Sequence, residues 1–166
     1  KLSGFDMQIL AYDPFVSEES AKELGVKLVS FEELVCQSDY ISVHCPLTAQ
    51  THHIVNEDVL RAMKKTAFLI NTSRGATVDT EALYRACRDG EIAGAAIDVT
   101  EQEPLPADSP LRTLSNLIIT PHIAWYTEEA IATLKEKLAQ EIIRVYEGGQ
   151  PINIVNRNSL KGMETK

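Results

Sequence analysis

The sequence has no apolar run that approaches the roughly 20 residues needed to span a bilayer, and it shows no signal-peptide pattern. We therefore expect no membrane partner and a cytoplasmic location. Cysteine is scarce, since the three thiols (Cys36, Cys45 and Cys87) are an odd number, lie far apart and form no CxxC pair. This pattern argues against a disulfide framework and against a zinc site, and it predicts reduced thiols and no bound metal.

The chain also lacks an excess of positive charge. Its 16 Lys and Arg residues face 24 Asp and Glu residues, so the formal net charge is −8. Nucleic acid is therefore not an expected partner. The 166 residues, of which 44% are hydrophobic, are sufficient for one domain with a substantial core.

No GxGxxG fingerprint and no internal repeat occur anywhere in the 166 residues. What the chain does contain is a regular alternation of short, nearly continuous apolar runs with helix-like segments. Strands are predicted at residues 9–12, 26–29, 39–44, 68–70, 92–99 and 116–120, and helices at 18–24, after Ser30, at 57–63, at 81–88 and from Thr127 to about Tyr146. This alternation is typical of an α/β fold, a Rossmann-like doubly wound parallel sheet with helices on both faces.

Chemically active side chains follow several of the predicted strands. They are Asp13, His44-Cys45-Pro46, Arg74, Asp98 and His122. Because the carboxyl ends of parallel strands share one edge of a sheet, these residues should meet there. The stretch from Leu69 to Gly75 is central, since a buried strand ends in small polar residues and a cation. Arg74 could hold a carboxylate or phosphate through two hydrogen bonds, or it could be an ordinary surface or helix-dipole arginine.

Three of the acidic and basic residues allow two interpretations each. A carboxylate after an early strand can accept hydrogen bonds from the adenosine ribose and favour NAD over NADP, but Asp13 before Pro14 is also a common turn. His122 after Pro121 could transfer protons near neutral pH, with Glu103 stabilising its imidazolium form. The alternatives are a turn histidine and a solvated loop acid.

Three motifs occur in a fixed order: Asn71-Thr72-Ser73-Arg74-Gly75, then Asp98-Val99 with Glu103-Pro104, then Thr120-Pro121-His122. Together they closely resemble the D-isomer-specific 2-hydroxyacid dehydrogenases. The resemblance implies that Arg74 holds the substrate carboxylate and carbonyl, and that His122 is the acid/base, paired with Glu103. It also implies that Asp98 contacts the nicotinamide carboxamide and that Asp13 contacts the ribose.

The resemblance implies a full set of contacts with cofactor and substrate. The residues expected to contact NAD are Asp13, His44, Cys45, Pro46, Thr72, Ser73, Asp98 and His122. The residues expected to contact the substrate are Arg74, His122 and Trp125.

The resemblance extends over residues 4–156, but parts of the family pattern are absent from the sequence. These parts are the first Rossmann strand, the glycine loop and the amino-terminal half of the substrate domain. Residues 1–123 are therefore expected to form the C-terminal part of the NAD-binding domain, and residues 124–166 a helix returning to the substrate domain with its last segment. Such a chain alone should hold a pyrophosphate poorly. Because the family dimerises through this domain, a homodimer is expected.

The sequence thus predicts an NAD-dependent oxidoreductase that interconverts a small-molecule 2-keto acid and a D-2-hydroxy acid by hydride transfer. A second interpretation comes from the stretch His122-Ile123-Ala124-Trp125-Tyr126, which resembles the C-terminal-binding-protein branch more than phosphoglycerate dehydrogenase. The alternative function is an NAD-sensing transcriptional corepressor or interaction protein, in which dinucleotide binding drives dimerisation and partner capture.

Overall fold

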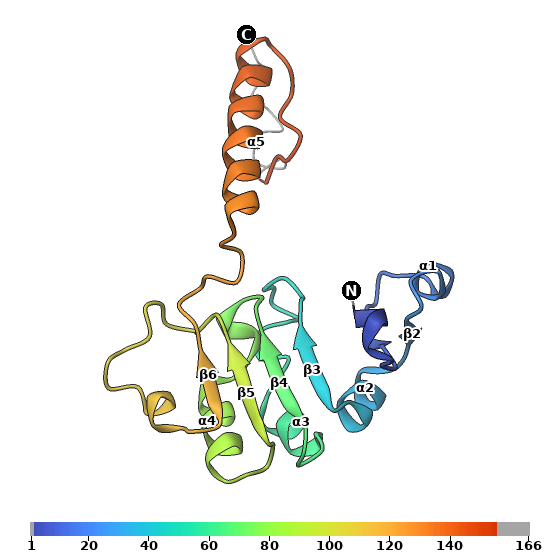
Figure 1. Cartoon of the computed structure of the whole chain (residues 1–166), viewed down its shortest axis with the longest axis vertical. Coiled ribbons are helices and arrows are strands. Elements are labelled where there is room, and N and C mark those ends of the chain that lie inside the picture. The colour runs from blue at the N-terminus through green and yellow to red at the C-terminus, as the bar shows by residue number, and fades with distance from the viewer. Residues whose placement is uncertain (1, 156–166) are drawn as a thin grey trace. The chain divides into compact units, whose positions relative to one another are not determined.

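The computed structural model describes residues 2–155, which divide into two compact units at the junction between Ala124 and Trp125 (Figure 1). The predicted C-terminal segment runs to residue 166, so its last part lies outside the described residues. None of the helices in residues 2–155 combines the length and apolar character that a transmembrane segment requires.

The first unit alternates strands and helices along the chain, as predicted. Its strands are β1 (Leu10–Ala11), β2 (Lys27–Leu28), β3 (Tyr40–Val43), β4 (Phe68–Asn71), β5 (Gly94–Ile97) and β6 (Leu117–Ile119). Its α-helices are α1 (Glu18–Glu23), α2 (Phe31–Gln37), α3 (Glu57–Ala62) and α4 (Thr80–Arg88), and short 3₁₀ helices lie at Leu2–Phe5, Gly75–Thr77 and Pro110–Thr113. Most strands are shorter than predicted, because the apolar runs continue beyond the last paired residue into loops. β4 instead continues one residue further than predicted, to Asn71.

The strands form two separate parallel sheets. β3, β4, β5 and β6 lie side by side in that order, with Ile41 beside Leu69 and Leu69 beside Ala95. β1 pairs only with β2. Within residues 2–155 no strand pairing joins the two sheets, so one side of β1 and one side of β3 have no neighbouring strand. The parallel α/β fold is confirmed, whereas its division into two sheets was not predicted.

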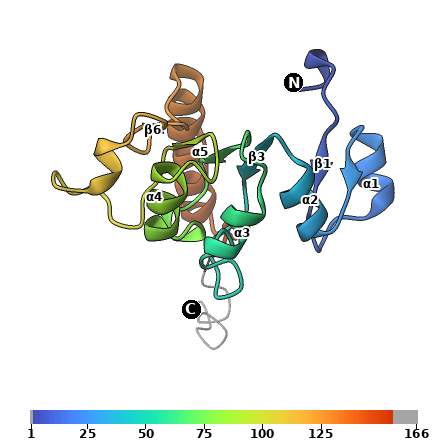
Figure 2. The ribbon, with the colours of Figure 1, turned by 90° about the horizontal axis from the view of Figure 1, so that it is seen from below.

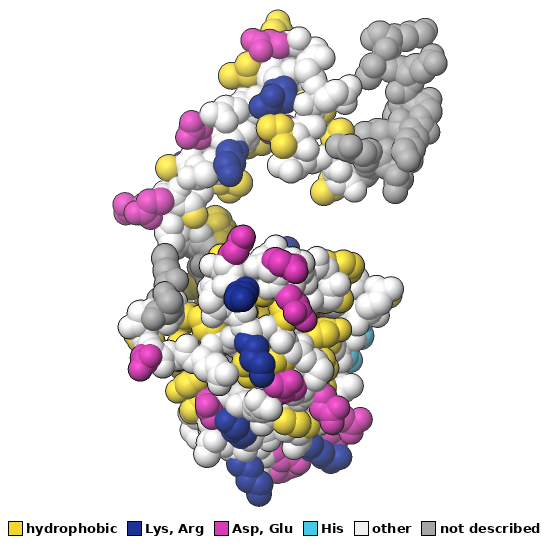
Figure 3. Space-filling model, turned by 90° about the vertical axis from the view of Figure 1, so that its right-hand side faces the viewer, with side chains coloured by type: hydrophobic (Ala, Val, Ile, Leu, Met, Phe, Trp, Pro, Cys, Tyr) yellow, Lys and Arg dark blue, Asp and Glu magenta, His cyan; other side chains and the backbone are white. Residues whose placement is uncertain are grey.

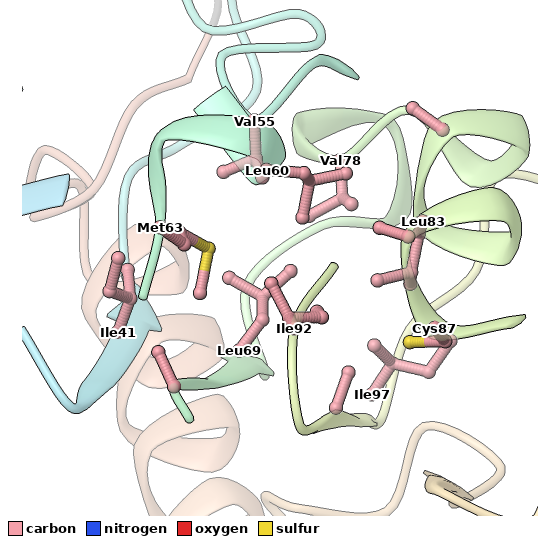
Figure 4. Packing of buried hydrophobic residues seen from close by; sticks show 14 of the residues in the cluster. Ile41, Val55, Leu60, Met63, Leu69, Val78, Leu83, Cys87, Ile92 and Ile97 are labelled. Carbon is pink, nitrogen blue, oxygen red and sulfur yellow. The ribbon is translucent and has the colours of Figure 1, made fainter. Parts of the chain in front are cut away.

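The core lies on one face of the four-stranded sheet. Leu69 of β4 and Ile97 of β5 pack with Leu60 of α3 and Leu83 of α4 (Figure 4). Leu60, Leu69 and Leu83 are at most 2% exposed. Truncating such a leucine to alanine costs about 2–5 kcal/mol, so these contacts hold β4, and the turn that follows it, firmly in place.

The opposite face of the four-stranded sheet is open. Tyr40, Phe68 and Ile118 have 63%, 39% and 67% of their surface exposed, and the rings of Tyr40 and Phe68 stack with centroids 5.7 Å apart. Figure 2 shows α3 and α4 on one side of the sheet. Helices on both faces are therefore not found among the described residues of this unit. The physical reason is that right-handed crossovers which advance in one direction, from β3 to β6, put every connection on the same face.

Local sequence signals determine where the helices begin. Ser30, Asn56, Asp79 and Thr127 each accept a hydrogen bond from the backbone N–H three residues further on, at 3.0–3.1 Å. The predicted helices after Ser30, at 57–63, at 81–88 and from Thr127 begin at or just after these residues, and each such cap stabilises its helix by about 1 kcal/mol.

The surface carries charges of both signs. Figure 3 shows acidic and basic side chains next to one another, with apolar side chains between them. Lys27 pairs with Glu33 at 3.0 Å and Lys64 with Asp39 at 2.8 Å. Exposed pairs of this kind stabilise a fold only slightly.

The second unit consists of α5 (Glu128–Tyr146) and the segment after it. The helix ends at Tyr146, as the sequence predicted, and Gly148 follows at φ +83°. The following chain turns back along α5, and the Ile152 N–H donates to Glu141 Oε2 at 2.9 Å (Figure 1). No residue of α5 is buried among the described residues.

Candidate active site

The carboxyl ends of β3 to β6 lie along one edge of the four-stranded sheet, as predicted. An open cavity of about 490 Å³ at the ends of β3 and β4 is lined by His44, Cys45, Pro46, Leu47, Ser73 and Arg74. The structure therefore brings together predicted residues that are about 30 positions apart in sequence, as expected for neighbouring parallel strands.

Asn71 organises the turn that presents Arg74. This residue is 1% exposed at the end of β4. Its Nδ2 donates to the Arg74 carbonyl at 3.0 Å, and its Oδ1 accepts from the Ser73 N–H at 3.0 Å. The buried Thr77 donates from its hydroxyl to the same Arg74 carbonyl at 2.7 Å. Because an unpaired buried polar group costs about 1–3 kcal/mol, these bonds favour a single conformation of the turn.

Arg74 itself is exposed at the cavity. Its Nη1 donates to the Ser73 carbonyl at 2.6 Å. Within residues 2–155 the guanidinium forms no ion pair with a carboxylate. Its planar set of donors can therefore bind the carboxylate of a ligand through two parallel hydrogen bonds.

Glu103 and His122 form a hydrogen-bonded pair across 19 positions of sequence. His122 Nδ1 lies 2.9 Å from Glu103 Oε2, and the Thr100 N–H donates to Glu103 Oε1 at 3.1 Å. The hydrogen bond with His122 is the largest reason that the pKa of Glu103 lies below its usual range. Glu103 is therefore ionised at neutral pH and can stabilise an imidazolium.

Asp98 connects the end of β5 to the turn that carries His122. It is 5% exposed. Its carboxylate accepts hydrogen bonds from the Thr120 hydroxyl and, at 2.9 Å each, from the N–H groups of Ile123 and Ala124. Burial alone would raise the pKa of Asp98, but these hydrogen bonds outweigh it and hold the pKa below its usual range. The charge of Asp98 thus holds the Thr120 side chain before the histidine and the backbone after it.

Two residues that follow β3, His44 and Cys45, lie in the lining of the cavity. His44 Nε2 lies 2.8 Å from the Ser42 hydroxyl. Burial raises the pKa of the Cys45 thiol, so this cysteine is neutral near pH 7. Together with Pro46 they line the same cavity as Arg74.

Comparison with known proteins identifies the family. Residues 1–124 match the family described as D-isomer specific 2-hydroxyacid dehydrogenase, NAD binding domain. The chain belongs to this family. As a member of the D-2-hydroxyacid dehydrogenases, it has the Rossmann-like fold and the NAD cofactor that the motifs implied.

Individual relatives give the same result. The chain is 46% identical over 161 residues to a glyoxylate reductase from Korarchaeum cryptofilum, covering 97% of this chain and 48% of that protein. It is 41% identical over 161 residues to a D-3-phosphoglycerate dehydrogenase from Archaeoglobus fulgidus, covering 97% and 31%. The crystal structure of D-lactate dehydrogenase with NAD⁺ from Lactobacillus jensenii matches with a TM-score of 0.84 at 30% identity, covering 93% and 50%. The chain thus spans about half the length of its relatives, or less.

The residues at this sheet edge could hold the nicotinamide end of NAD. A carboxylate offers about four acceptor positions, and the hydrogen bonds described for Asp98 occupy three of them. One position is left for a carboxamide N–H. Pro46 and Leu47 supply apolar cavity surface suited to a flat ring.

The cavity lining does not include Asp13, Thr72, Asp98, Glu103, His122 or Trp125. Asp13 follows β1 in the two-stranded sheet, and its Oδ1 accepts from the Phe15 N–H at 2.8 Å, which is the turn that the sequence offered as its alternative role. Trp125 belongs to the second unit, where its ring meets Tyr126 edge to face at 5.2 Å. The roles of all the predicted site residues in binding and catalysis stay predictions.

Sequence reasoning missed several residues that shape this site. Asn71 and Gly75 belong to a quoted motif but received no role, although a polar residue ending an apolar run was a usable signal. Glu101 and His53 gave no signal at all, because their contact joins positions 48 apart.

Proposed function

We propose that the intact protein carrying this chain is an NAD-dependent oxidoreductase that interconverts a 2-keto acid and a D-2-hydroxy acid. The observation that carries the proposal is the hydrogen-bonded Glu103–His122 pair at the same sheet edge as an Arg74 that forms no ion pair within residues 2–155. The names of the relatives, glyoxylate reductase and D-3-phosphoglycerate dehydrogenase, agree with this chemistry.

His122 acts as the acid in the reduction. NADH, when bound, supplies the hydride that reaches the carbonyl carbon. Because Nδ1 of His122 faces Glu103, we assign transfer of the proton to the carbonyl oxygen to Nε2 on the opposite side of the ring. In the oxidation of the hydroxy acid the neutral imidazole takes the proton back from the hydroxyl.

Arg74 binds and orients the substrate. Its guanidinium holds the carboxylate through paired hydrogen bonds and polarises the neighbouring carbonyl oxygen, on which negative charge develops. The hydrogen bonds of Asn71 and Thr77 to the Arg74 carbonyl fix the backbone from which this side chain projects. Orientation of this kind lowers the barrier because less freedom is lost in the transition state.

The test is reduction of 2-keto acids by the intact protein with NADH. Glyoxylate, pyruvate and 3-phosphohydroxypyruvate are the substrates to compare, since their reduced forms correspond to the activities named for the relatives. Steady NADH consumption, with D-configured product from pyruvate, is the expected result. Absence of turnover on every 2-keto acid of a broad panel, in protein that binds NADH, would refute the proposal.

The NAD-sensing interaction protein stays the alternative. Its sequence signal was the pair Trp125 and Tyr126, and Trp125 has 49% of its surface exposed. NADH-dependent dimerisation without any turnover would favour this alternative over the enzyme.

A further inference from the structure

Glu101 connects three segments around the candidate site. It lies two positions before Glu103 in the loop after β5. Its Oε1 accepts from the Thr80 N–H at the start of α4 at 2.8 Å, and its Oε2 lies 3.2 Å from His53 Nε2. One carboxylate therefore ties the loop that carries Glu103 to α4 and to the segment that precedes α3.

His53 is itself fixed to the turn that follows Arg74. Its backbone N–H donates to the Ala76 carbonyl at 2.8 Å, and its φ is +50°. Its ring lies 4.0 Å from the ring of His52, and its Nδ1 is 3.9 Å from Asp79 Oδ2. The hydrogen bond of the His53 backbone to Ala76 thus fixes the position from which the imidazole contacts Glu101.

The loops that carry Arg74 and Glu103 also touch directly. A Cβ added at Gly75 would lie 2.1 Å from the backbone carbon and oxygen of Thr100 and 2.5 Å from the backbone nitrogen of Glu101. Thr100 in turn donates its N–H to Glu103. A short, stiff path of contacts therefore links the substrate anchor to the acid/base pair.

We propose that Glu101, held by His53 and Thr80, is a positioning residue that sets the Glu103–His122 pair relative to Arg74. Neither Glu101 nor His53 lines the cavity or contacts Glu103 and His122 in the described hydrogen bonds. They act on the distance between Arg74 and the Glu103–His122 pair, because they hold the two loops that bind and protonate the substrate in fixed relative positions. This inference rests on the function proposed above.

The charge of Glu101 supports this role. Burial raises its pKa, but the hydrogen bonds from Thr80 and His53 outweigh burial, and the pKa of Glu101 lies below its usual range. The groups that face this carboxylate are His53 and the Thr80 N–H at the start of α4, and Asp79 lies on the far side of His53. The carboxylate is ionised whenever the site operates near neutral pH.

The experiment compares Glu101→Ala, Glu101→Gln and the matched control Glu81→Ala in the intact protein. Glu81 is an exposed acid in the first turn of the same helix, α4. Because a misplacement of about 1 Å can cost roughly 10²-fold in rate, Glu101→Ala should lower kcat by about that factor. Affinity for NADH should change little. Glu101→Gln keeps an oxygen for the Thr80 N–H, so it should recover part of the loss.

The pH profile separates positioning from loss of stability. If Glu103 shifts away from His122, the imidazolium loses its partner, and the high-pH limit of reduction should move to lower pH in Glu101→Ala. A merely destabilised variant would lower the amplitude at every pH without moving the limit, and this outcome would overturn the inference. Adding His53→Ala to Glu101→Ala should have little further effect, because both substitutions remove the same contact between His53 and Glu101.

A second readout does not depend on turnover. The pH at which the ring signals of His122 titrate, followed by NMR in the intact protein, should fall in Glu101→Ala and stay unchanged in Glu81→Ala. If the wild type reduces no 2-keto acid but this shift is present, the proposed function fails and the positioning role stands. If the wild type is active and Glu101→Ala moves neither the rate limit nor the NMR titration, the positioning role is wrong.

Discussion

Two hydrogen bonds and an unusual backbone conformation restrict where the ring of His122 can lie. Its Nδ1 is 2.9 Å from Glu103 Oε2, its backbone N–H donates to the Asp98 carbonyl at 2.8 Å, and its φ is +56°. A residue in such a sparsely populated conformation costs of order 1–3 kcal/mol, which the surrounding hydrogen bonds must offset. At the scale of single residues, His122 adopts a conformation that costs stability but fixes the position of its imidazole.

Removing this imidazole gives the most direct test of its role. In the intact protein, His122→Ala should lower kcat for 2-keto acid reduction by roughly 10²–10⁴-fold, the usual contribution of a positioned proton donor. Affinity for NADH, measured by fluorescence titration, should hardly change, which serves as the internal control for folding. A variant that keeps full kcat would exclude His122 as the acid.

Glu103→Gln should change the pH dependence more than the maximal rate. Because the pKa of Glu103 lies below its usual range, its carboxylate is ionised near neutral pH and is neutralised only as the pH falls through the lowered value. Glutamine removes the charge that stabilises the imidazolium, so His122 gives up its proton at lower pH. The high-pH limit of reduction should therefore move downward. An unchanged limit would mean that Glu103 does not assist His122.

The sequence allowed Arg74 and His122 to be predicted for one physical reason, whereas Glu103 was chosen as a carboxylate that could stabilise the imidazolium and through the family resemblance. The ends of parallel strands converge, so charged residues that follow apolar runs are visible without knowledge of the packing. Glu101 could not be identified in this way, since it is one of several acids in the loop from Thr100 to Pro110. Only the folded chain shows that its carboxylate, and not a neighbouring one, reaches His53.

At the scale of structural elements, the turn after β4 depends on a glycine that has no room for a side chain. Gly75→Ala would put a Cβ 2.1 Å from the backbone of Thr100, and backbone atoms cannot move away as a flexible side chain can. We expect a loss of about 1–3 kcal/mol in the free energy of unfolding, measured by urea denaturation. Gly4→Ala, where nothing lies within 4 Å of the added Cβ, is the matched control. Equal stability of the two variants would contradict the close approach of the loops.

The buried carboxylate of Asp98 joins β5 to the turn after β6. Its charge should make the free energy of unfolding depend on pH in the acid range. Asp98→Asn replaces one acceptor oxygen by an amide that cannot accept the N–H of Ile123 or Ala124, so it should cost about 1–3 kcal/mol at neutral pH. The pKa of Asp98 is lowered in the fold. Its stabilisation is therefore complete above about pH 3.9 and declines below it. Urea denaturation at several pH values should show wild type and variant converging in acid, whereas a constant difference would assign the effect to packing alone.

Helix starts and strand limits differ in how far the sequence determines them. The caps Ser30, Asn56, Asp79 and Thr127 act on N–H groups three residues away, so the relevant partners are local and were predicted. A strand ends where its neighbour stops pairing, and that neighbour is distant in sequence. The apolar run from Ile92 to Val99 therefore predicted a strand that the structure limits to Gly94–Ile97.

At the scale of the whole molecule, the division into two sheets and the open face could not be read from the apolar pattern. The runs at β3 and β4 are nearly continuous in apolar residues, which predicted helices on both faces, yet Tyr40 and Phe68 are exposed. The pattern records which residues prefer burial, whereas the direction of the crossovers decides which face receives the helices. The homodimer, the cytoplasmic location and the preference of Asp13 for NAD over NADP stay predictions.

The open face of the four-stranded sheet leads to a last prediction, which concerns the 166-residue chain by itself. Tyr40, Phe68 and Ile118 present apolar surface on one side of the sheet, next to a side of β3 that has no neighbouring strand. Exposed apolar patches and open strand edges both promote association. The chain alone should therefore self-associate as its concentration rises, and Ile118→Thr should reduce this, because threonine keeps the β-branched shape while adding a hydroxyl. Leu24→Thr is the control, since Leu24 is 77% exposed but follows α1, away from the sheet. Light scattering that shows equal association for both variants would mean that the open face does not cause it.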